Sequence, residues 1–184
     1  ALVNAFKQDL DIHLQTAIKI FGEDEAKDKR AIAKTINFGL LYGMGSKKLS
    51  DTLGISSKEA KIYIESYFKA FKSVKDYLKS IEESAHVNGY IKTLLNRKRL
   101  FNFESANAML KAAYLREAVN TMFQGSAADL IKLSMVKIHK KYKNNDNMRM
   151  LLQIHDELIF EVKEDIADEI IIDLKEIMEN IYEL

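Results

Sequence analysis

The chain has 184 residues, of which 47% are hydrophobic and 30% are charged, so it has enough apolar side chains for the core of one globular domain. This composition excludes a disordered chain, and the sequence contains no apolar run of about 18 residues that could span a membrane. Cysteine is absent, which excludes disulfides and thiolate metal sites. Residues 1–7 lack the pattern of a signal peptide, and we therefore expect a cytoplasmic protein with no membrane contact.

The net charge of +1 combines two basic segments with one acidic segment. Residues 27–48 carry six Lys or Arg and one Asp, and residues 89–99 carry four basic residues and no acidic one. Residues 164–184 carry eight acidic residues against Lys175. Two basic segments on a nearly neutral chain favour local contact with phosphates, although solvated helix faces would give the same pattern.

The N-terminal two-thirds of the chain is predicted to be helical. In residues 57–84, apolar side chains recur mostly every three or four residues with Lys and Glu between them. This periodicity predicts an amphipathic helix or a pair of them. Ser56 or Ser57, ahead of Glu59, is a suitable N-cap. Packing in the core explains the aromatic stripe of this segment without a functional role.

Two short β elements are predicted further along. Residues 89–100 have β-favouring side chains on either side of Asn96, which predicts a hairpin with a basic tip. Residues 106–141 return to a helical pattern. In residues 148–162, two apolar runs flank a polar tripeptide, the pattern of two buried strands joined by a turn. An acidic amphipathic helix over residues 165–182 follows, so the predicted fold is α+β and mostly helical, with short antiparallel hairpins.

The most informative segment is KRAIAKTINFGLLYGMG, residues 29–45. Two cations and two aromatic rings in it are spaced by four residues: Arg30, Lys34, Phe38 and Tyr42. On a helix they form one slowly drifting stripe. This set suits a nucleoside triphosphate, because cations can meet phosphates while rings pack against sugar and base. The alternative is a helix buried on its Phe and Tyr side. A P-loop is excluded, because GMGSKK lacks the Walker spacing.

RAIAKTINFGLLYG closely resembles RxxxKxxxFxxxYG, a motif of family A DNA polymerases carried by the fingers helix called O. We expect that helix at about residues 27–43. The resemblance implies that Arg30 and Lys34 hold the incoming triphosphate and that Lys34 can protonate the leaving pyrophosphate. It also implies that Phe38 lies against the sugar and Tyr42 at the templating-base pocket.

Two further segments resemble the same family. DIHLQTA resembles DIHxxTA, which implies that His13 lies near the phosphates; without the resemblance it would be an ordinary surface histidine. Three hydrogen-bond donors are four residues apart in REAVNTMFQGSAADL: Arg116, Asn120 and Gln124. Such donors can follow duplex shape at minor-groove acceptors. The stretch resembles RxxxNxPxQGxAAD, with Met122 in place of the usual proline. An exposed polar helix face is the alternative.

QIHDELIFEV, residues 153–162, resembles the HDE motif of the family's palm hairpin. A tight turn between strands can hold a carboxylate against Mg²⁺ and the primer terminus. The resemblance implies that Asp156 is the metal ligand and a catalytic carboxylate, with Glu157 as the weaker candidate. It also implies that His155 lies beside the primer end.

The resemblance covers about residues 11–162 and, more loosely, the acidic helix beyond. It implies a bacterial polymerase in which residues 1–88 form the fingers subdomain and residues 89–184 form part of the palm, with an approximate boundary. The family's first palm motif, DYSxIELR, does not occur in the sequence, and we expect the thumb to be missing as well. The two-metal site is therefore expected to be incomplete in this chain.

Two functions remain open. In the first, the chain is a fragment of a template-directed DNA polymerase that adds deoxynucleotides to a primer 3′ end by two-metal phosphoryl transfer with Mg²⁺, and it is inactive alone. In the second, it is an inactive module that binds nucleotide or DNA. The expected partners are deoxynucleoside triphosphates and primer–template DNA, which Arg97 and Arg99 would also contact, and no obligate protein partner is evident.

Overall fold

The structure of the chain is a computed structural model that describes residues 2–183. The chain divides into two compact units. The first comprises residues 1–91 and 98–120, and the second comprises residues 92–97 and 121–184. Within residues 2–183, no helix is both long and apolar enough to cross a membrane.

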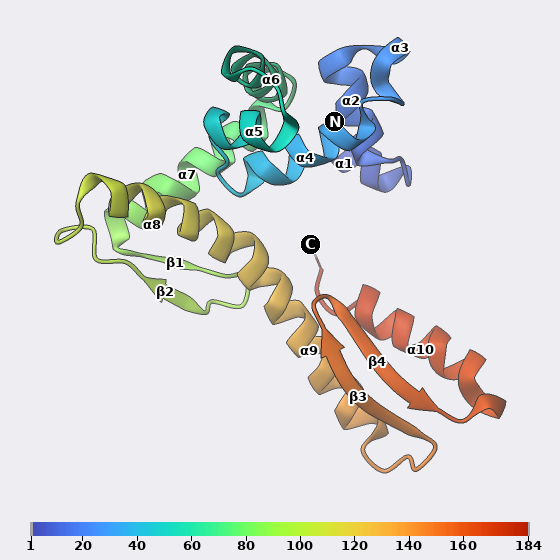
Figure 1. Cartoon of the computed structure of the whole chain (residues 1–184). Coiled ribbons are helices and arrows are strands. Elements are labelled where there is room, and N and C mark those ends of the chain that lie inside the picture. Colours follow the sequence, from blue (N-terminus) through green and yellow to red (C-terminus); the bar gives the residue numbers. More distant parts are fainter. Residues whose placement is uncertain (1, 184) are drawn as a thin grey trace. The chain divides into compact units, whose positions relative to one another are not determined.

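Helices dominate the first unit, and the β1–β2 hairpin comes between α7 and α8 in the chain (Figure 1), with its residues 92–97 assigned to the second unit. Its elements, in order, are α1 (Leu2–Lys7), α2 (Ile12–Phe21), α3 (Glu23–Ala26), α4 (Arg30–Leu41), α5 (Ser46–Leu53), α6 (Ser57–Ala70), α7 (Lys72–Asn88), β1 (Tyr90–Lys92), β2 (Lys98–Leu100) and α8 (Ala108–Asn120). The predicted hairpin is confirmed, and Asn96 in its turn has a positive φ of 63°.

The amphipathic pattern of residues 57–84 forms two helices, α6 and α7, which meet at Phe71. Ser56 is the N-cap of α6: its Oγ accepts from the backbone N of Glu59 at 3.2 Å, and its own N donates to the Glu59 carboxylate at 3.0 Å. This capping box satisfies two backbone donors that the first turn leaves free. The apolar side of α6 packs into the main core of the unit: Ile36, Leu40, Leu49, Ala60, Tyr67 and Phe71.

Helix α4 has one buried and one exposed side. Ile36 and Leu40 are 0% and 4% exposed in the core, whereas Phe38 on the other side is 45% exposed. The helix is shorter than the expected residues 27–43: it begins at Arg30 and ends at Leu41, so that Tyr42 is its C-cap. The next residue, Gly43, has a φ of +73° and turns the chain away from the helix.

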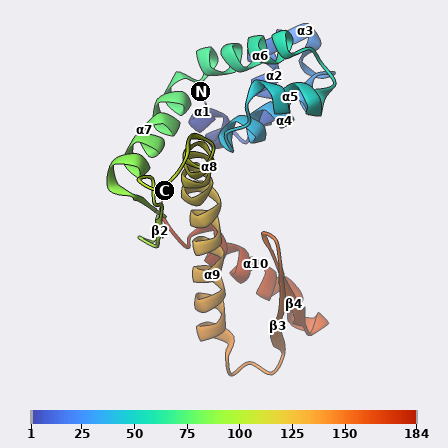
Figure 2. The ribbon, with the colours of Figure 1, turned by 60° about the vertical axis from the view of Figure 1, so that its left-hand side comes forward.

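The second unit contains α9 (Ser126–Tyr142), β3 (Met148–Ile154), β4 (Glu157–Val162), a 3₁₀ turn (Glu164–Ile166) and α10 (Ala167–Glu179). Its first segment after α8 is a π-helical turn, Thr121–Gly125, so the helix expected over residues 106–141 is not regular throughout. Helices α9 and α10 lie beside the β3–β4 hairpin (Figures 1 and 2). The core between them is Ile138, Met148, Ile170, Leu174 and Ile177.

The expectation that β3 and β4 are two buried strands is wrong. They pair antiparallel, from Met148 opposite Val162 to Ile154 opposite Glu157, with an irregularity between Met150 and Leu152. Leu152 is 57% exposed, because the helices cover one face of the hairpin and no described element of this unit covers the other. The α+β, mostly helical fold class is confirmed, with two two-stranded sheets among the described residues.

Candidate functional site

A cavity of about 870 Å³ lies in the first unit, beside the exposed side of α4. Three of the four stripe residues line it: Lys34, Phe38 and Tyr42. The other lining residues come from α4, the turn after it, α5 and α8: Thr35, Gly39, Gly43, Met44, Gly45, Lys47, Lys48, Asp51 and Arg116. Four of these twelve residues are cationic and one is acidic, a net charge of +3 that favours an anionic ligand.

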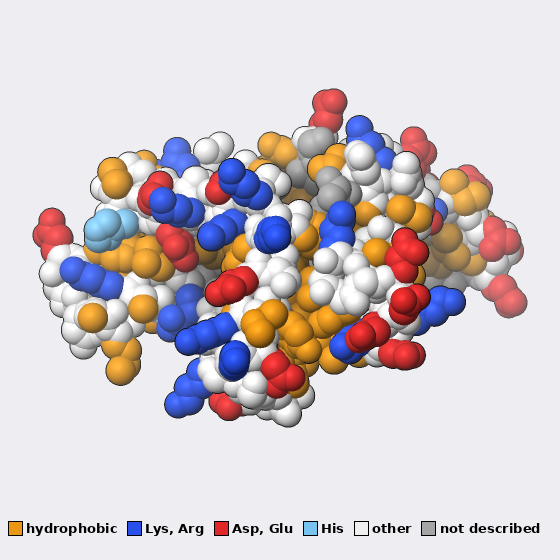
Figure 3. Space-filling view, turned by 90° about the horizontal axis from the view of Figure 1, so that it is seen from above, with side chains coloured by type: hydrophobic (Ala, Val, Ile, Leu, Met, Phe, Trp, Pro, Cys, Tyr) orange, Lys and Arg blue, Asp and Glu red, His pale blue; other side chains and the backbone are white. Residues whose placement is uncertain are grey.

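The two rings of the stripe lie nearly parallel. Phe38 and Tyr42 have centroids 6.5 Å apart and an interplanar angle of 18°. The Phe38 ring is held by the helix while nearly half of its surface faces solvent, so a flat or apolar part of a ligand can cover it without rearrangement of α4. Lys and Arg side chains group beside hydrophobic ones on the face drawn in Figure 3.

Arg116 lies in the wall of this cavity, on α8, and it packs over Gly43. A Cβ atom built on Gly43 would be 2.8 Å from Cγ of Arg116. Sequence reasoning placed Arg116 in a groove-reading stripe. The structure brings this residue to the same cavity as Lys34 and Tyr42, an arrangement that only the packing of α8 against the turn reveals.

Arg30, the first residue of the stripe, is not among the residues that line the cavity, and its side chain pairs with Asp11, the N-cap of α2. Its Nε donates to Oδ2 of Asp11 at 2.5 Å, while Oδ1 of Asp11 caps α2 by accepting from the backbone N of His13 and Leu14 at 2.9 and 3.0 Å. The Leu14 hydrogen bond and then Arg30 lower the pKa of the Asp11 carboxyl. The hydrogen bond to Asp11 uses Nε of Arg30, and the Nη groups of the guanidinium can donate to a further acceptor.

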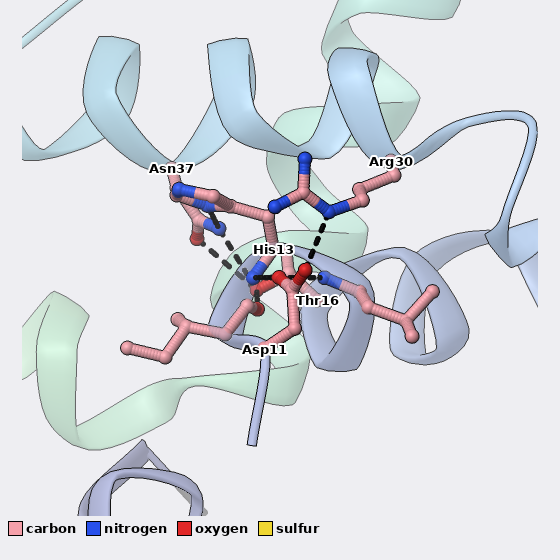
Figure 4. A network of polar contacts seen from close by, with 7 residues as sticks. Asp11, His13, Thr16, Arg30 and Asn37 are labelled. Carbon is pink, nitrogen blue, oxygen red and sulfur yellow. Dashed lines mark hydrogen bonds and ion pairs between the residues drawn. The ribbon is translucent and has the colours of Figure 1, made fainter. Parts of the chain in front are cut away.

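His13 joins the same group from α2. Its ring centroid lies 5.5 Å from that of Phe38, and its Nδ1 lies 3.0 Å from Nδ2 of Asn37 on α4 (Figure 4). Burial lowers the pKa of His13; the charge of Asp11 opposes this shift, and the charges of Arg30 and Lys34 add to it. The lowered pKa favours the neutral imidazole at pH 7.

Sequence reasoning missed Asp11, Thr16 and Asn37. Thr16 and Asn37 are 0% and 5% exposed and hydrogen-bond each other between α2 and α4. A polar residue next to Ile36, on the side of α4 that should be apolar, was the signal that could have found Asn37.

Arg97 and Arg99, which the sequence predicts to contact DNA, both form ion pairs. In the second unit, Arg97 donates through Nε to Asp129 Oδ1 at 2.9 Å and through Nη2 to the Gly125 carbonyl at 3.0 Å. Thr93 Oγ1 donates to the other oxygen of Asp129 at 2.5 Å. In the first unit, Arg99 Nη2 donates to Glu117 at 2.7 Å.

The three residues of the predicted donor stripe belong to two different units. Arg116 and Asn120 are on α8 in the first unit, and Gln124 lies in the π-helical turn of the second. Oδ1 of Asn120 is buried and accepts no hydrogen bond from a described residue, so it has the capacity for a ligand or water. Gln124 is exposed.

The HDE tripeptide forms the turn between β3 and β4 in the second unit. His155 has a positive φ of 53°, and Asp156 and Glu157 are exposed. The Gln153 side chain closes the turn by donating to the His155 carbonyl at 3.1 Å. In the described part of the chain, no cluster of three or more His, Asp or Glu could hold a metal ion. Mg²⁺ prefers six oxygens in octahedral geometry, so this turn does not fit a whole Mg²⁺ site.

The comparisons with known proteins agree with one another. The family model described as DNA polymerase family A matches residues 1–184. DNA polymerase I of Helicobacter pylori is 57% identical over 169 residues, which are 92% of this chain and 19% of that protein. The thermostable DNA polymerase I of Thermus filiformis is 43% identical over 188 residues, which are 100% of this chain and 22% of that protein.

A solved structure is similar over the whole chain. It is the POL domain of Pol1 from M. smegmatis in complex with DNA primer-template and dNTP, with a TM-score of 0.92 and 38% identity. The match covers 100% of this chain and 33% of that one. The chain thus spans about one fifth of the length of these curated relatives.

Proposed function

The chain belongs to DNA polymerase family A, and we propose that it is part of a template-directed DNA polymerase, in which it binds the incoming deoxynucleoside triphosphate and the adjoining DNA. The observation that carries this proposal is the cavity beside α4, where Lys34, Phe38 and Tyr42 lie together with Arg116. Cations and near-parallel rings on one rigid helix suit the phosphates and the flat parts of a nucleotide. The M. smegmatis relative, which is in complex with primer-template and dNTP, supports the same ligands.

The proposed roles divide along α4. Arg30 and Lys34 take the triphosphate, and Lys34 also protonates the leaving pyrophosphate. His13 donates a hydrogen bond to the same anion. Phe38 lies against the sugar, and Tyr42 lies at the templating base. All five side chains belong to the first unit, which is the part of the chain that we assign to the fingers together with the start of the palm.

The proposed DNA contacts come from both units. Arg116 and Asn120 in the first unit and Gln124 in the second are proposed to follow the minor groove. Arg97 and Arg99 are proposed to contact DNA with the N–H groups that Asp129 and Glu117 leave free. Because both arginine side chains are about half exposed, DNA phosphates can compete for these guanidinium groups.

The proposed reaction of the whole enzyme is two-metal phosphoryl transfer to a primer 3′ end, with Mg²⁺ as the metal. Asp156 is the ligand that this chain would supply, with Glu157 as the weaker candidate and His155 beside the primer end. The remaining carboxylates must come from elsewhere in the polymerase, and the cytoplasmic location stays a prediction.

The proposal is tested by the affinity of the chain for a deoxynucleoside triphosphate. Lys34→Ala should weaken binding about 10- to 100-fold, because it removes a charge-assisted hydrogen bond of roughly 1.5–3 kcal/mol. The control is Lys58→Ala, an exposed lysine on α6 outside the cavity, which should bind like the unchanged chain. Equal affinities for both variants would remove Lys34 from the site.

The second function, an inactive binding module, is distinguished by primer extension with the polymerase that contains this chain. Template-directed extension that Lys34→Ala slows by about two orders of magnitude supports the enzyme. Triphosphate binding without any extension supports the binding module.

A further inference from the structure

Asn37 has no role in the stripe, yet together with Thr16 it forms a buried polar link between α4 and α2. Its side chain is 5% exposed, and Nδ2 lies 3.0 Å from two atoms: Oγ1 of Thr16 and Nδ1 of His13. An amide nitrogen carries two hydrogens, so it can donate to both at once. Figure 4 shows these residues facing one another between the two helices.

The orientation of the Asn37 amide agrees with the hydrogen bonding of Thr16. The Thr16 hydroxyl has one hydrogen, and Oγ1 lies 2.9 Å from the carbonyl oxygen of Ile12, which can only accept. The Asn37 Oδ1 is the longer alternative at 3.2 Å. With its hydrogen on the Ile12 carbonyl, Thr16 can only accept from Asn37. The structure places the amide nitrogen at the shorter distance, 3.0 Å, so that Thr16 accepts over its closer contact with Asn37.

This orientation determines which nitrogen of His13 carries a proton. Nδ1 receives an N–H from Asn37, so it must be the unprotonated acceptor. In a neutral imidazole the proton is then on Nε2. Nε2 has no hydrogen bond to any residue between 2 and 183, so its N–H is available to a ligand.

We propose that Asn37 is a positioning residue that holds His13 as a neutral imidazole with its proton on Nε2, and so presents an N–H donor to the triphosphate. This inference rests on the proposed function for its ligand, but the state of the His13 ring does not depend on that ligand. The chain of contacts runs from the Ile12 carbonyl through Thr16 and Asn37 to His13, and every member is on α2 or α4.

The charged groups around His13 favour the same state. Arg30 and Lys34 on α4 oppose a positive charge on the ring, and Asp11 on α2 favours it. Protonation of Nδ1 would also turn its hydrogen against the N–H of Asn37 in the orientation that the amide has in the structure. The pKa of His13 is lowered, chiefly by burial, in agreement with a ring that stays neutral.

The first test is NMR of the chain with ¹⁵N-labelled histidine, in which ring couplings report which nitrogen is protonated. His13→Gln identifies the His13 signals among the four histidines. We expect Nε2 to be protonated and Nδ1 to be free from pH 7 to 9. A proton on Nδ1 of the unchanged chain would overturn the inference without any further variant.

The second test is Asn37→Asp, which has nearly the same shape but replaces the donor with an acceptor. The carboxylate should draw the proton to Nδ1 and raise the pKa of His13. Affinity for dATP should then fall about tenfold to a hundredfold as the pH rises through that pKa, because Nε2 loses its proton. Binding should recover at lower pH, and the same variant combined with His13→Gln should lose this pH dependence.

The outcomes separate the inference from the proposed function. If Asn37 has only a structural role, Asn37→Asp should weaken dATP binding equally at all pH values and leave the protonation of the His13 ring unchanged. That result would overturn the inference. If the unchanged chain shows the expected ring state but binds no dATP, the triphosphate role fails while control of the ring by Asn37 stands. If Asn37→Asp does not fold, the NMR measurement of which His13 nitrogen is protonated in the unchanged chain still tests the inference.

Discussion

A Cβ atom on Gly43 would lie 2.8 Å from Cγ of Arg116, so the turn after α4 and helix α8 approach as closely as a residue without a side chain allows. The same glycine has a φ of +73°, a conformation that L side chains rarely adopt. Steric space and backbone conformation therefore both require glycine here, at a position in the wall of the candidate nucleotide cavity.

Gly43→Ala should destabilise the chain by roughly 1–3 kcal/mol and displace Arg116, because both the left-handed backbone and the close contact oppose a methyl group. The measurement is urea unfolding followed by circular dichroism, together with triphosphate affinity. Gly45→Ala is the control, since a Cβ there meets nothing within 4 Å and its φ is −82°. Because Gly45 is the N-cap of α5, where alanine is less favourable than glycine, this control should cost no more than about 1 kcal/mol. Equal stability of both variants would contradict the role of Gly43.

The Asp11 pair with Arg30 should make stability depend on pH in the acid range. Asp11→Asn keeps a side-chain cap on α2 but loses the ion pair, whereas Asp11→Ala loses both. We expect Asp11→Asn to lower the free energy of unfolding by about 0–1 kcal/mol, since the ion pair is partly exposed. Asp11→Ala should lower it by about 1 kcal/mol more, because the cap is lost as well. The measurement is urea unfolding at pH 7.

The sign of the pH effect follows from the lowered pKa of Asp11. A carboxyl with a lowered pKa in the folded state contributes stability above its unfolded value, here 3.8, and loses it as the pH falls through the folded value. The difference between the unchanged chain and Asp11→Asn should therefore be present at pH 7 and shrink below pH 3.8. A difference that is constant across this range would show that Arg30 does not stabilise the charged form.

Phe38→Tyr should relax discrimination against dideoxynucleotides in the polymerase that contains this chain. Phenylalanine cannot supply the hydroxyl that a dideoxynucleotide lacks, whereas tyrosine can, at a ring that is 45% exposed beside the cavity. The measurement is the ratio of dideoxynucleotide to deoxynucleotide incorporation. Phe6→Tyr, on the exposed side of α1, is the control and should leave the ratio unchanged. Equal incorporation of both nucleotides by the unchanged polymerase would refute the assignment of Phe38 to the sugar.

Asp129→Asn should destabilise the second unit by roughly 1–3 kcal/mol. Asp129 is 7% exposed and accepts from both Arg97 and Thr93, and an amide can replace only one of these acceptors. Glu179→Gln is the control, because its ion pair with Lys175 is long, 3.8 Å, and exposed. It should change the free energy of unfolding by less than about 0.5 kcal/mol. Urea unfolding that finds the two variants equally stable would contradict the anchoring of Arg97.

Local sequence was sufficient for the cap of α6 and for the face of α4 that Lys34, Phe38 and Tyr42 share. The cap of α6 depends on Ser56 and Glu59, which are three residues apart, and the stripe of α4 depends on a four-residue period. Both features follow from the geometry of a single helix and involve no residue distant in sequence. The hairpin around Asn96 follows in the same way from turn preference.

Tertiary structure alone decided the partners of these side chains. Asn37 meets His13 across 24 positions and Arg97 meets Asp129 across 32, and no local periodicity encodes either contact. The exposure of Leu152 likewise depends on which face of the hairpin a helix covers, although its apolar run predicted burial. Periodicity determines which side chains share a face, whereas the partner of that face is chosen by packing and hydrogen bonding between segments distant in sequence.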